Sequence, residues 1–274
     1  MKTIRISSIF ILFAVFIFIF TSCEKDQITN TEDAVTTTEE ATAAEGMFDD
    51  AFEQAEMYEN NVPNKSTAED YCIPIITIST DVQFPRVVTI DFGTDGCEGR
   101  YGAIRRGKII VTVTAFFMEI GSKRIVTFDG YSVNGYQVEG TKTVTNMGQN
   151  ESDNWVRKIE VDGSVTTPEG NVITRISTRE REWVEGADTP FYFWDDVFSI
   201  TGTASGVNSK GVDYTAEITS PLIKARNCRW IQEGVLTIVS GENTVIIDYG
   251  DGTKCDNVAI ATVNGEEKEI KFKW

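Results

Sequence analysis

The sequence contains no histidine among its 274 residues. This absence excludes the Ser-His-Asp and Cys-His arrangements of nucleophilic catalysis, and it excludes the commonest zinc and non-haem iron sites. Basic residues are also scarce, because 25 lysines and arginines face 42 aspartates and glutamates, which gives a net charge of −17. An acidic chain without a basic stripe is a poor binder of nucleic acid. The chemistry that remains open uses carboxylate pairs, lysine, tyrosine or Ca²⁺ bound through oxygen.

Long apolar runs are rare as well, and the one at residues 9–20 is only twelve residues long. Lys2 and Arg5 precede this run, and Thr21-Ser22-Cys23 follows it. A charged start, an apolar centre and small residues before a cysteine look like a bacterial lipoprotein signal peptide. This order predicts removal of residues 1–22 and acylation of Cys23, with palmitate among the chains that hold the protein to a membrane. An uncleaved membrane anchor is the alternative, but twelve residues fall short of the roughly 20 that span a bilayer.

The remaining cysteines point to disulfide bonds. They are Cys72, Cys97, Cys228 and Cys255. An even number in an exported protein implies disulfides, and four cysteines allow three pairings. An internal repeat selects one: Asp91 and Asp248 follow the first cysteine of each pair by 19 and 20 positions, and the closing cysteine follows them by six and seven. The repeats, residues 72–115 and 228–274, therefore predict the pairs Cys72–Cys97 and Cys228–Cys255, each closing a disulfide-tied hairpin.

The chain between the signal and the first repeat divides into two parts. Residues 23–43 are polar and acidic, without apolar periodicity, and predict a disordered tether. Residues 44–60 predict an amphipathic helix, because Ala44, Phe48, Phe52 and other apolar residues recur at helical spacing while acids occupy the other face. We expect this helix to pack against the sheet and close its open face or edge; the alternative is that it docks into a groove of a partner.

Residues 71–274 have the character of β-structure. Runs of five to ten residues rich in Val, Ile, Thr and aromatics alternate with turns such as Asn134-Gly135 and Asn264-Gly265. About eleven to thirteen strands with short links leave no room for crossover helices. The prediction is an all-β fold with one N-terminal helix, in which an antiparallel meander forms a curved sheet, a sandwich or a partial barrel.

Several segments carry a resemblance to putative lipoproteins of the Bacteroidetes group. They are Thr-Ser-Cys-Glu-Lys-Asp at 21–26, Val-Asn-Gly-Tyr-Gln-Val-Glu-Gly-Thr at 133–141, Arg-Glu-Trp-Val-Glu-Gly at 181–186, Ser-Ile-Thr-Gly-Thr-Ala-Ser-Gly at 199–206 and Asp-Tyr-Gly-Asp-Gly-Thr at 248–253. The resemblance implies a lipid-anchored protein of the outer membrane and brings no activity with it. The residues after Cys23 resemble a signal for export to the cell surface. We therefore expect the protein at the cell surface rather than at the periplasmic face of the outer membrane.

An aromatic stretch interleaved with carboxylates is the first candidate ligand site. It comprises Trp183, Phe191, Tyr192, Trp194, Asp195 and Asp196. Exposed aromatic faces beside carboxylates suit sugars, and aromatic rings dominate binding hot spots generally. Successive side chains of a strand alternate between faces, so the four aromatics at 191–194 cannot all point inward. The alternative is that these rings bury against the sheet.

Two further groups are weaker candidates. Glycine-rich turns at Asp91 and Asp95, and again at Asp248 and Asp251, suit Ca²⁺, although aspartate is also the usual residue of a structural β-turn. No other cofactor is indicated.

A row of arginines, namely Arg175, Arg179 and Arg181, shares one face of a predicted strand. The row can bind an anion. More commonly such a row pairs with acids of the neighbouring strand, here Glu160 or Glu139.

These features favour a lipid-anchored binding or interaction module without enzymatic activity, whose partner is a glycan or a surface protein. A periplasm-facing carrier of lipid or another small molecule is the first alternative, and it requires an apolar cavity in the curved sheet. A glycoside hydrolase acting through two carboxylates such as Asp195 and Asp196 is the second.

Overall fold

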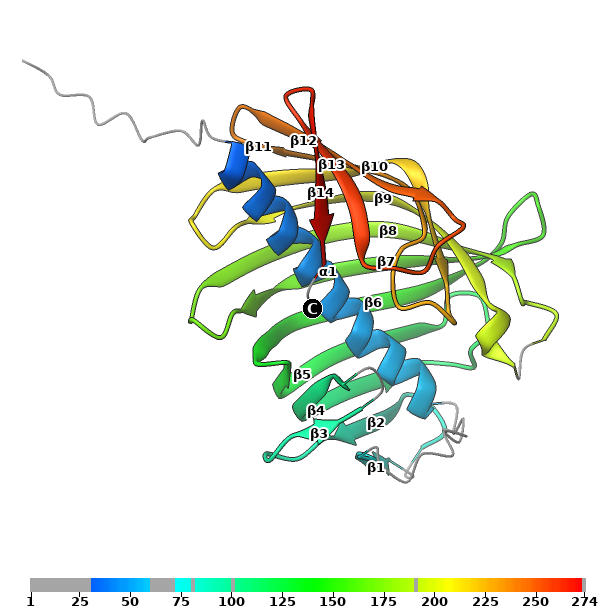
Figure 1. Ribbon diagram of the computed structural model, residues 1–274. Helices are drawn as coiled ribbons and strands as arrows, with labels where there is room; N and C mark the ends of the chain where they lie inside the picture. Colours follow the sequence, from blue (N-terminus) through cyan, green and yellow to red (C-terminus); the bar gives the residue numbers. More distant parts are fainter. Residues whose placement is uncertain (1–30, 60–71, 80–81, 100–101, 190–191, 273–274) are drawn as a thin grey trace, which may run out of the picture.

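The computed structural model describes residues 31–59, 72–79, 82–99, 102–189 and 192–272. The predicted signal peptide, Cys23 with the first part of the tether, and Phe191 lie outside the described residues. Within these ranges fourteen strands form one antiparallel sheet in the order β1-β2-β4 and onward in sequence to β14, with the short β3 pairing to β4 (Figure 1). The strands are β1 (Ile75–Ile78), β2 (Arg86–Asp91), β3 (Cys97–Glu98), β4 (Ile104–Val113), β5 (Lys123–Val133), β6 (Tyr136–Gln149), β7 (Trp155–Thr166), β8 (Val172–Glu185), β9 (Val197–Val207), β10 (Asp213–Ala225), β11 (Glu233–Ser240), β12 (Asn243–Asp251), β13 (Val258–Val263) and β14 (Glu266–Lys271).

The predicted all-β meander is confirmed as a single open sheet. Two of its two-residue hairpins turn at Asn134-Gly135 and Asn264-Gly265, where all four residues have positive φ, from 51° to 86°. A type I′ turn requires this conformation at both central residues, and its twist matches that of the flanking strands. Sequence-adjacent strands therefore pair directly, and every strand from β4 to β14 lies beside the strands that precede and follow it.

One long helix, α1 (Thr31–Glu59), lies diagonally across one face of the sheet (Figure 1). It contacts β2, β4 to β8 and β11 to β13, so the sheet curves around it. We call the face that contacts α1 the inner face and the opposite face the outer face. The expected packing of the helix against the sheet is confirmed.

The predicted tether is wrong over its last part, because α1 begins at Thr31 and residues 31–43 belong to it. Ala34, Val35 and Ala41 are buried in a core formed with the last strands. The threonine hydroxyls of this segment bond back to the helix, as in Thr42 Oγ1 to Thr38 O at 2.8 Å. Composition alone suggested disorder, but helices gain most of their stability from tertiary packing, and here small apolar side chains find a sheet to cover.

Two apolar cores lie between α1 and the inner face. The first packs Met47, Phe48 and Phe52 against the inner side chains of β2 and β4 to β8. Phe48 lies directly above Gly163 of β7, where an added Cβ would approach its ring to 2.6 Å. The second core joins the N-terminal part of α1 to β9 through β14. The helix thus meets the early strands with large side chains and the late strands with small ones.

Both predicted disulfides are present. Cys72–Cys97 encloses the hairpin β1–β2, and Cys228–Cys255 encloses the hairpin β11–β12, with sequence separations of 25 and 27 residues. The repeat inferred from cysteine spacing therefore corresponds to two equivalent stapled hairpins. One lies near each end of the sheet.

Candidate functional site

The arginine row of β8 points to the inner face, as its period of two requires. Its predicted partners on neighbouring strands are wrong, because the residues opposite Arg175, Arg179 and Arg181 on β7 are Gly163, Ile159 and Arg157. The two acids proposed as partners belong to the outer face. There Glu160 pairs with Lys158 at 2.7 Å, and Glu139 accepts a hydrogen bond from Gln137 at 3.3 Å. The arginines instead meet carboxylates of α1.

The first of these carboxylates is Glu45, which pairs with Arg175 and lies 2.9 Å from Arg179 Nη2. The two guanidinium groups also donate to backbone oxygens, Arg175 to Ala41 and Arg179 to Gly202. Burial of Glu45 opposes its ionisation, but the adjacent arginines outweigh burial and lower its pKa to about 2. Glu45 therefore remains ionised in the folded protein at neutral pH.

The second carboxylate, Glu56, is buried and meets three arginines. Arg157 and Arg181 lie 2.9 Å from its Oε1, and Arg226, just after β10, lies 2.6 Å from its Oε2. The arginines hold the pKa of Glu56 well below its usual range despite its burial. Burial also lowers the pKa of Arg157 to about 9, because Glu56 offsets the penalty only in part and the neighbouring arginines add to it. The lowered pKa of Arg157 thus reflects burial first and the neighbouring arginines second.

Asp196 adds a further carboxylate at the edge of this cluster. It follows the short helix η2 (Phe193–Asp195), is buried, and lies 3.4 Å from Arg226 Nε. Burial raises the pKa of Asp196 to about 6, against the opposing pull of Arg226. The adjacent Asp195 is half-buried and accepts a hydrogen bond from Thr189 at 2.8 Å. A carboxyl group that titrates near neutral pH beside a cavity marks a candidate functional site.

A cavity of about 190 Å³ lies beside these charged groups, between α1 and strands β8 to β12. Its apolar wall comprises Phe198, Ile200, Ala216, Ile218, Leu222, Leu236, Ile238, Tyr249 and Phe272. Its lining also includes Arg175, Arg179, Arg181 and Arg226 together with acids of α1. We call this space the central cavity. A single water needs only about 10–15 Å³ of such space, so the central cavity has room for a molecule larger than water.

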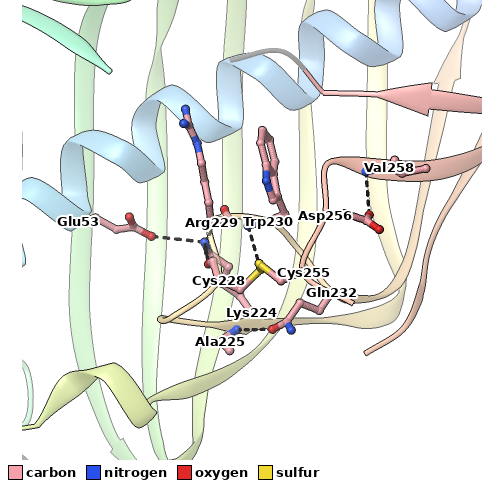
Figure 2. Close-up of a disulfide and its surroundings, with 10 residues drawn as sticks. All are labelled: Glu53, Lys224, Ala225, Cys228, Arg229, Trp230, Gln232, Cys255, Asp256 and Val258. Carbon is pink, nitrogen blue, oxygen red and sulfur yellow. Dashed lines mark hydrogen bonds and ion pairs between the residues drawn. A yellow bond between two sulfur atoms is a disulfide. The ribbon is translucent and has the colours of Figure 1, made fainter. Parts of the chain in front are cut away.

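The loop stapled by the second disulfide forms one side of the central cavity. Arg229 and Trp230 point from this loop toward α1 (Figure 2), and both line the cavity. Lys224 Nζ donates to the carbonyl oxygens of Cys228 and Arg229 at 2.8 and 2.7 Å, and it lies 3.6 Å from Glu53 of α1. The disulfide and this lysine fix the loop against the end of β10.

The predicted aromatic site is divided by the fold. Trp183 is buried and packs 6.1 Å from Phe198 between ring centroids, whereas Tyr192 is 61 % exposed. Trp194 is half-buried and lines the central cavity. These three aromatics face three different environments, so they form no continuous platform among the described residues.

The predicted Ca²⁺ ligands serve turns. Asp91 and Asp248 accept hydrogen bonds from the backbone of Gly93 and Gly250, at 2.9 and 2.8 Å. Asp251 binds both the backbone and the hydroxyl of Thr253, and Asp95 accepts from Thr94. Within the described ranges no cluster of three or more cysteine, aspartate or glutamate side chains is placed to hold a metal ion.

Several residues of the cavity and its charged wall were missed by sequence reasoning. Glu56 was assigned to the acidic face of the predicted helix, and Glu45, Arg226 and Trp230 were not singled out. The sequence did hold a signal for this pairing. Acidic residues recur along α1, and arginines stand at alternate positions of β8, so the two could have been predicted to face each other. In the part of the chain that the structure describes, no helix is both long and apolar enough to span a membrane. No protein-family model, curated protein or solved structure matches this chain.

Proposed function

We propose that this protein is a binding module of the bacterial envelope that holds a small, largely apolar molecule in the central cavity. The observation that carries the proposal is the apolar wall formed by β9, β10 and β11, which α1 faces across space that its own side chains do not fill. Cavities of this kind, with an apolar lining and a few convergent polar groups, are the usual form of small-molecule sites. Acylation of Cys23 would hold the module to the outer membrane, and the protein would act by binding rather than by chemistry.

This proposal favours the carrier among the functions expected from the sequence. A carrier requires an apolar cavity within the curved sheet, and the central cavity provides one. A sugar-binding surface would require its aromatic rings on the outside, but in the described part of the predicted aromatic site Tyr192 is strongly exposed while Trp183 is buried and Trp194 is half-buried.

The test uses fluorescence of Trp194 and Trp230, both of which line the central cavity. The full chain, held in a lipid nanodisc, is titrated with the methyl ester of dibrominated stearic acid, whose bromine atoms quench nearby indoles. We expect saturable quenching that is lost in Ala216→Phe, because the larger side chain fills the cavity.

The matched control is Thr215→Phe, which adds the same ring at the adjacent position on the outer face, where Thr215 is exposed. Its quenching should equal that of the unmodified protein. Equal quenching in Ala216→Phe and Thr215→Phe would remove the central cavity as the binding site.

A further inference from the structure

The charge of the central cavity is opposite to that of the protein. The chain carries a net charge of −17, yet seven basic residues and four acidic residues line the cavity. The basic residues are Arg105, Arg175, Arg179, Arg181, Lys224, Arg226 and Arg229, and the acidic residues are Glu45, Asp49, Asp50 and Glu53. The lining of the cavity therefore carries more positive than negative charge, although the protein as a whole is acidic.

Two of the basic residues that line the cavity, Arg181 and Arg226, also bind Glu56 of α1. Arg157 shares the same carboxylate, and Asp196 lies 3.4 Å from Arg226 Nε. Glu56 and Arg157 are buried, so solvent screens the charges of this group poorly.

An uncompensated buried charge is costly, and the cost is relieved when a counter-charge arrives. Arg181 Nε and Arg175 Nε are buried and have no hydrogen-bond partner among the described residues. A guanidinium group has five N–H donors, and at these two arginines the Nε–H lacks an acceptor in the described part of the chain. Basic residues outnumber acidic ones in the lining, so an anion in the cavity would be attracted by its charge.

The positive cluster meets the apolar wall at Phe198. The guanidinium carbon of Arg181 lies 4.4 Å from the centre of this ring, and that of Arg226 lies 5.6 Å from it. From Phe198 the apolar wall continues through Ile200 of β9 to Ile218 of β10. Arg181 and Arg226 therefore lie where the apolar wall begins, at Phe198.

From this arrangement we propose that the ligand is a single-chain amphiphile with one anionic head group, a carboxylate or a phosphate. The head group binds to Arg181 and Arg226 above Phe198, and the hydrocarbon chain lies along Ile200 and Ile218. This inference rests on the proposed function, which requires only that the cavity accept an apolar molecule.

The experiment compares ligands that differ only at the head group. The full chain in a lipid nanodisc is titrated with dibrominated stearic acid, its neutral methyl ester and the corresponding amine, and tryptophan quenching is followed. We expect the acid to bind at least about tenfold more tightly than the ester, the value of a hydrogen bond to a charged group. The amine should bind more weakly than both.

Two variants test which residue causes the preference for the acid over the ester. Arg181→Met should abolish the difference between acid and ester while Glu56 keeps two arginine partners. Arg124→Met is the matched control, because Arg124 is also a buried arginine paired with α1, through Glu59 at 2.8 Å, but does not line the cavity. The control should retain the preference for the acid.

The outcomes separate the two proposals. Equal binding of acid, ester and amine overturns the anionic head group and leaves the proposed function intact, whereas absence of quenching by the ester argues against the function itself. The amine comparison needs no variant, so it decides the matter even where Arg181→Met fails to fold. A brominated lysophosphatidic acid distinguishes the two anions: tighter binding than the fatty acid assigns a phosphate head, and weaker binding assigns a carboxylate.

Discussion

The two halves of the inner face are covered by the same helix in different ways. Over the early strands, α1 presents Met47, Phe48 and Phe52, and these fill the space above β2 and β4 to β8. Over the late strands it presents Ala34, Val35 and Ala41 to a comparable set of branched and aromatic side chains. The central cavity lies beside α1 mainly on this second side, where Glu45 and Glu53 of the helix line it together with Phe52.

The difference shows how one helix can serve both stability and binding. Close packing above the early strands fixes α1 in place through apolar contacts. Ion pairs hold the helix on both sides, as between Asp50 and Arg105 of β4 and between Glu56 and Arg226 after β10. Only on the second side does space remain between the helix and the apolar wall. We therefore expect changes on the first side to affect folding and changes on the second side to affect binding.

The largest expected effect comes from Phe48→Ala. Phe48 is 1 % exposed and packs edge-on against Phe128 at 5.8 Å between ring centroids. Removal of a buried phenyl ring costs about 3–5 kcal/mol. Chemical denaturation should show this loss, while Ile238→Val on the cavity wall should cost only about 0.5–1.5 kcal/mol. Similar losses in the two variants would erase the distinction between the two sides.

Removal of each disulfide should have an intermediate effect and sharpen the comparison. The double variants Cys72→Ser/Cys97→Ser and Cys228→Ser/Cys255→Ser open loops of similar length, so each should lower the free energy of unfolding by roughly 3 kcal/mol. Only the second should also weaken quenching by the brominated ester, because its loop carries Trp230 into the cavity wall. Equal effects of both variants on quenching would show that the second loop does not shape the site.

Lowering the pH should weaken the ion pairs of Glu45, and we expect this effect on stability to be the smallest of those considered. The pKa of Glu45 is lowered to about 2 from its ordinary value of 4.5, so the ionised group stabilises the fold above pH 4.5, and this stabilisation is lost as the pH falls toward 2. Asp196 acts in the opposite direction, because its raised pKa of about 6 makes its protonation favour the folded state below that pH. Since Glu45 is partly exposed, we expect its contribution not to exceed about 2 kcal/mol.

Hydrogen exchange along α1 measures this effect of acid. Amides around Glu45 should lose protection before amides around Phe52 as the pH is lowered from 4.5. Glu45→Gln should abolish the pH dependence in this segment. Simultaneous loss along the whole helix would mean that α1 is held as one unit, without a weaker side.

Much of the fold was predictable because its signals are local. The Asn-Gly turns, the alternation within strands and the spacing of cysteines around Asp91 and Asp248 predicted the meander and both disulfides. The start of α1 was not predictable in the same way, because Ala34 and Val35 are too few to show a helical stripe without the sheet they cover. Their burial depends on strands far away in sequence.

The site was less predictable than the fold, because it depends on which long-range partners meet. The alternation of β8 placed Arg175 and Arg181 on one face, but it left open which element covers that face. Acids on adjacent strands were the nearest candidates in sequence terms, and the register of β7 and β8 places Arg157 rather than an acid opposite Arg181. The cavity arises where small side chains lie at the crossing of the helix and the sheet. No sequence motif predicts such a crossing.

The strictly sequential order of the sheet has a consequence for the order of folding. Each hairpin closes a short loop, so the sheet can grow by adding neighbours one at a time at low entropic cost. Docking of α1 is different, because it joins residues as distant as Thr37 and Asn208, which are 171 positions apart and share a hydrogen bond at 2.8 Å. We therefore expect the helix to dock late, and substitutions in α1 to accelerate unfolding more than they slow folding.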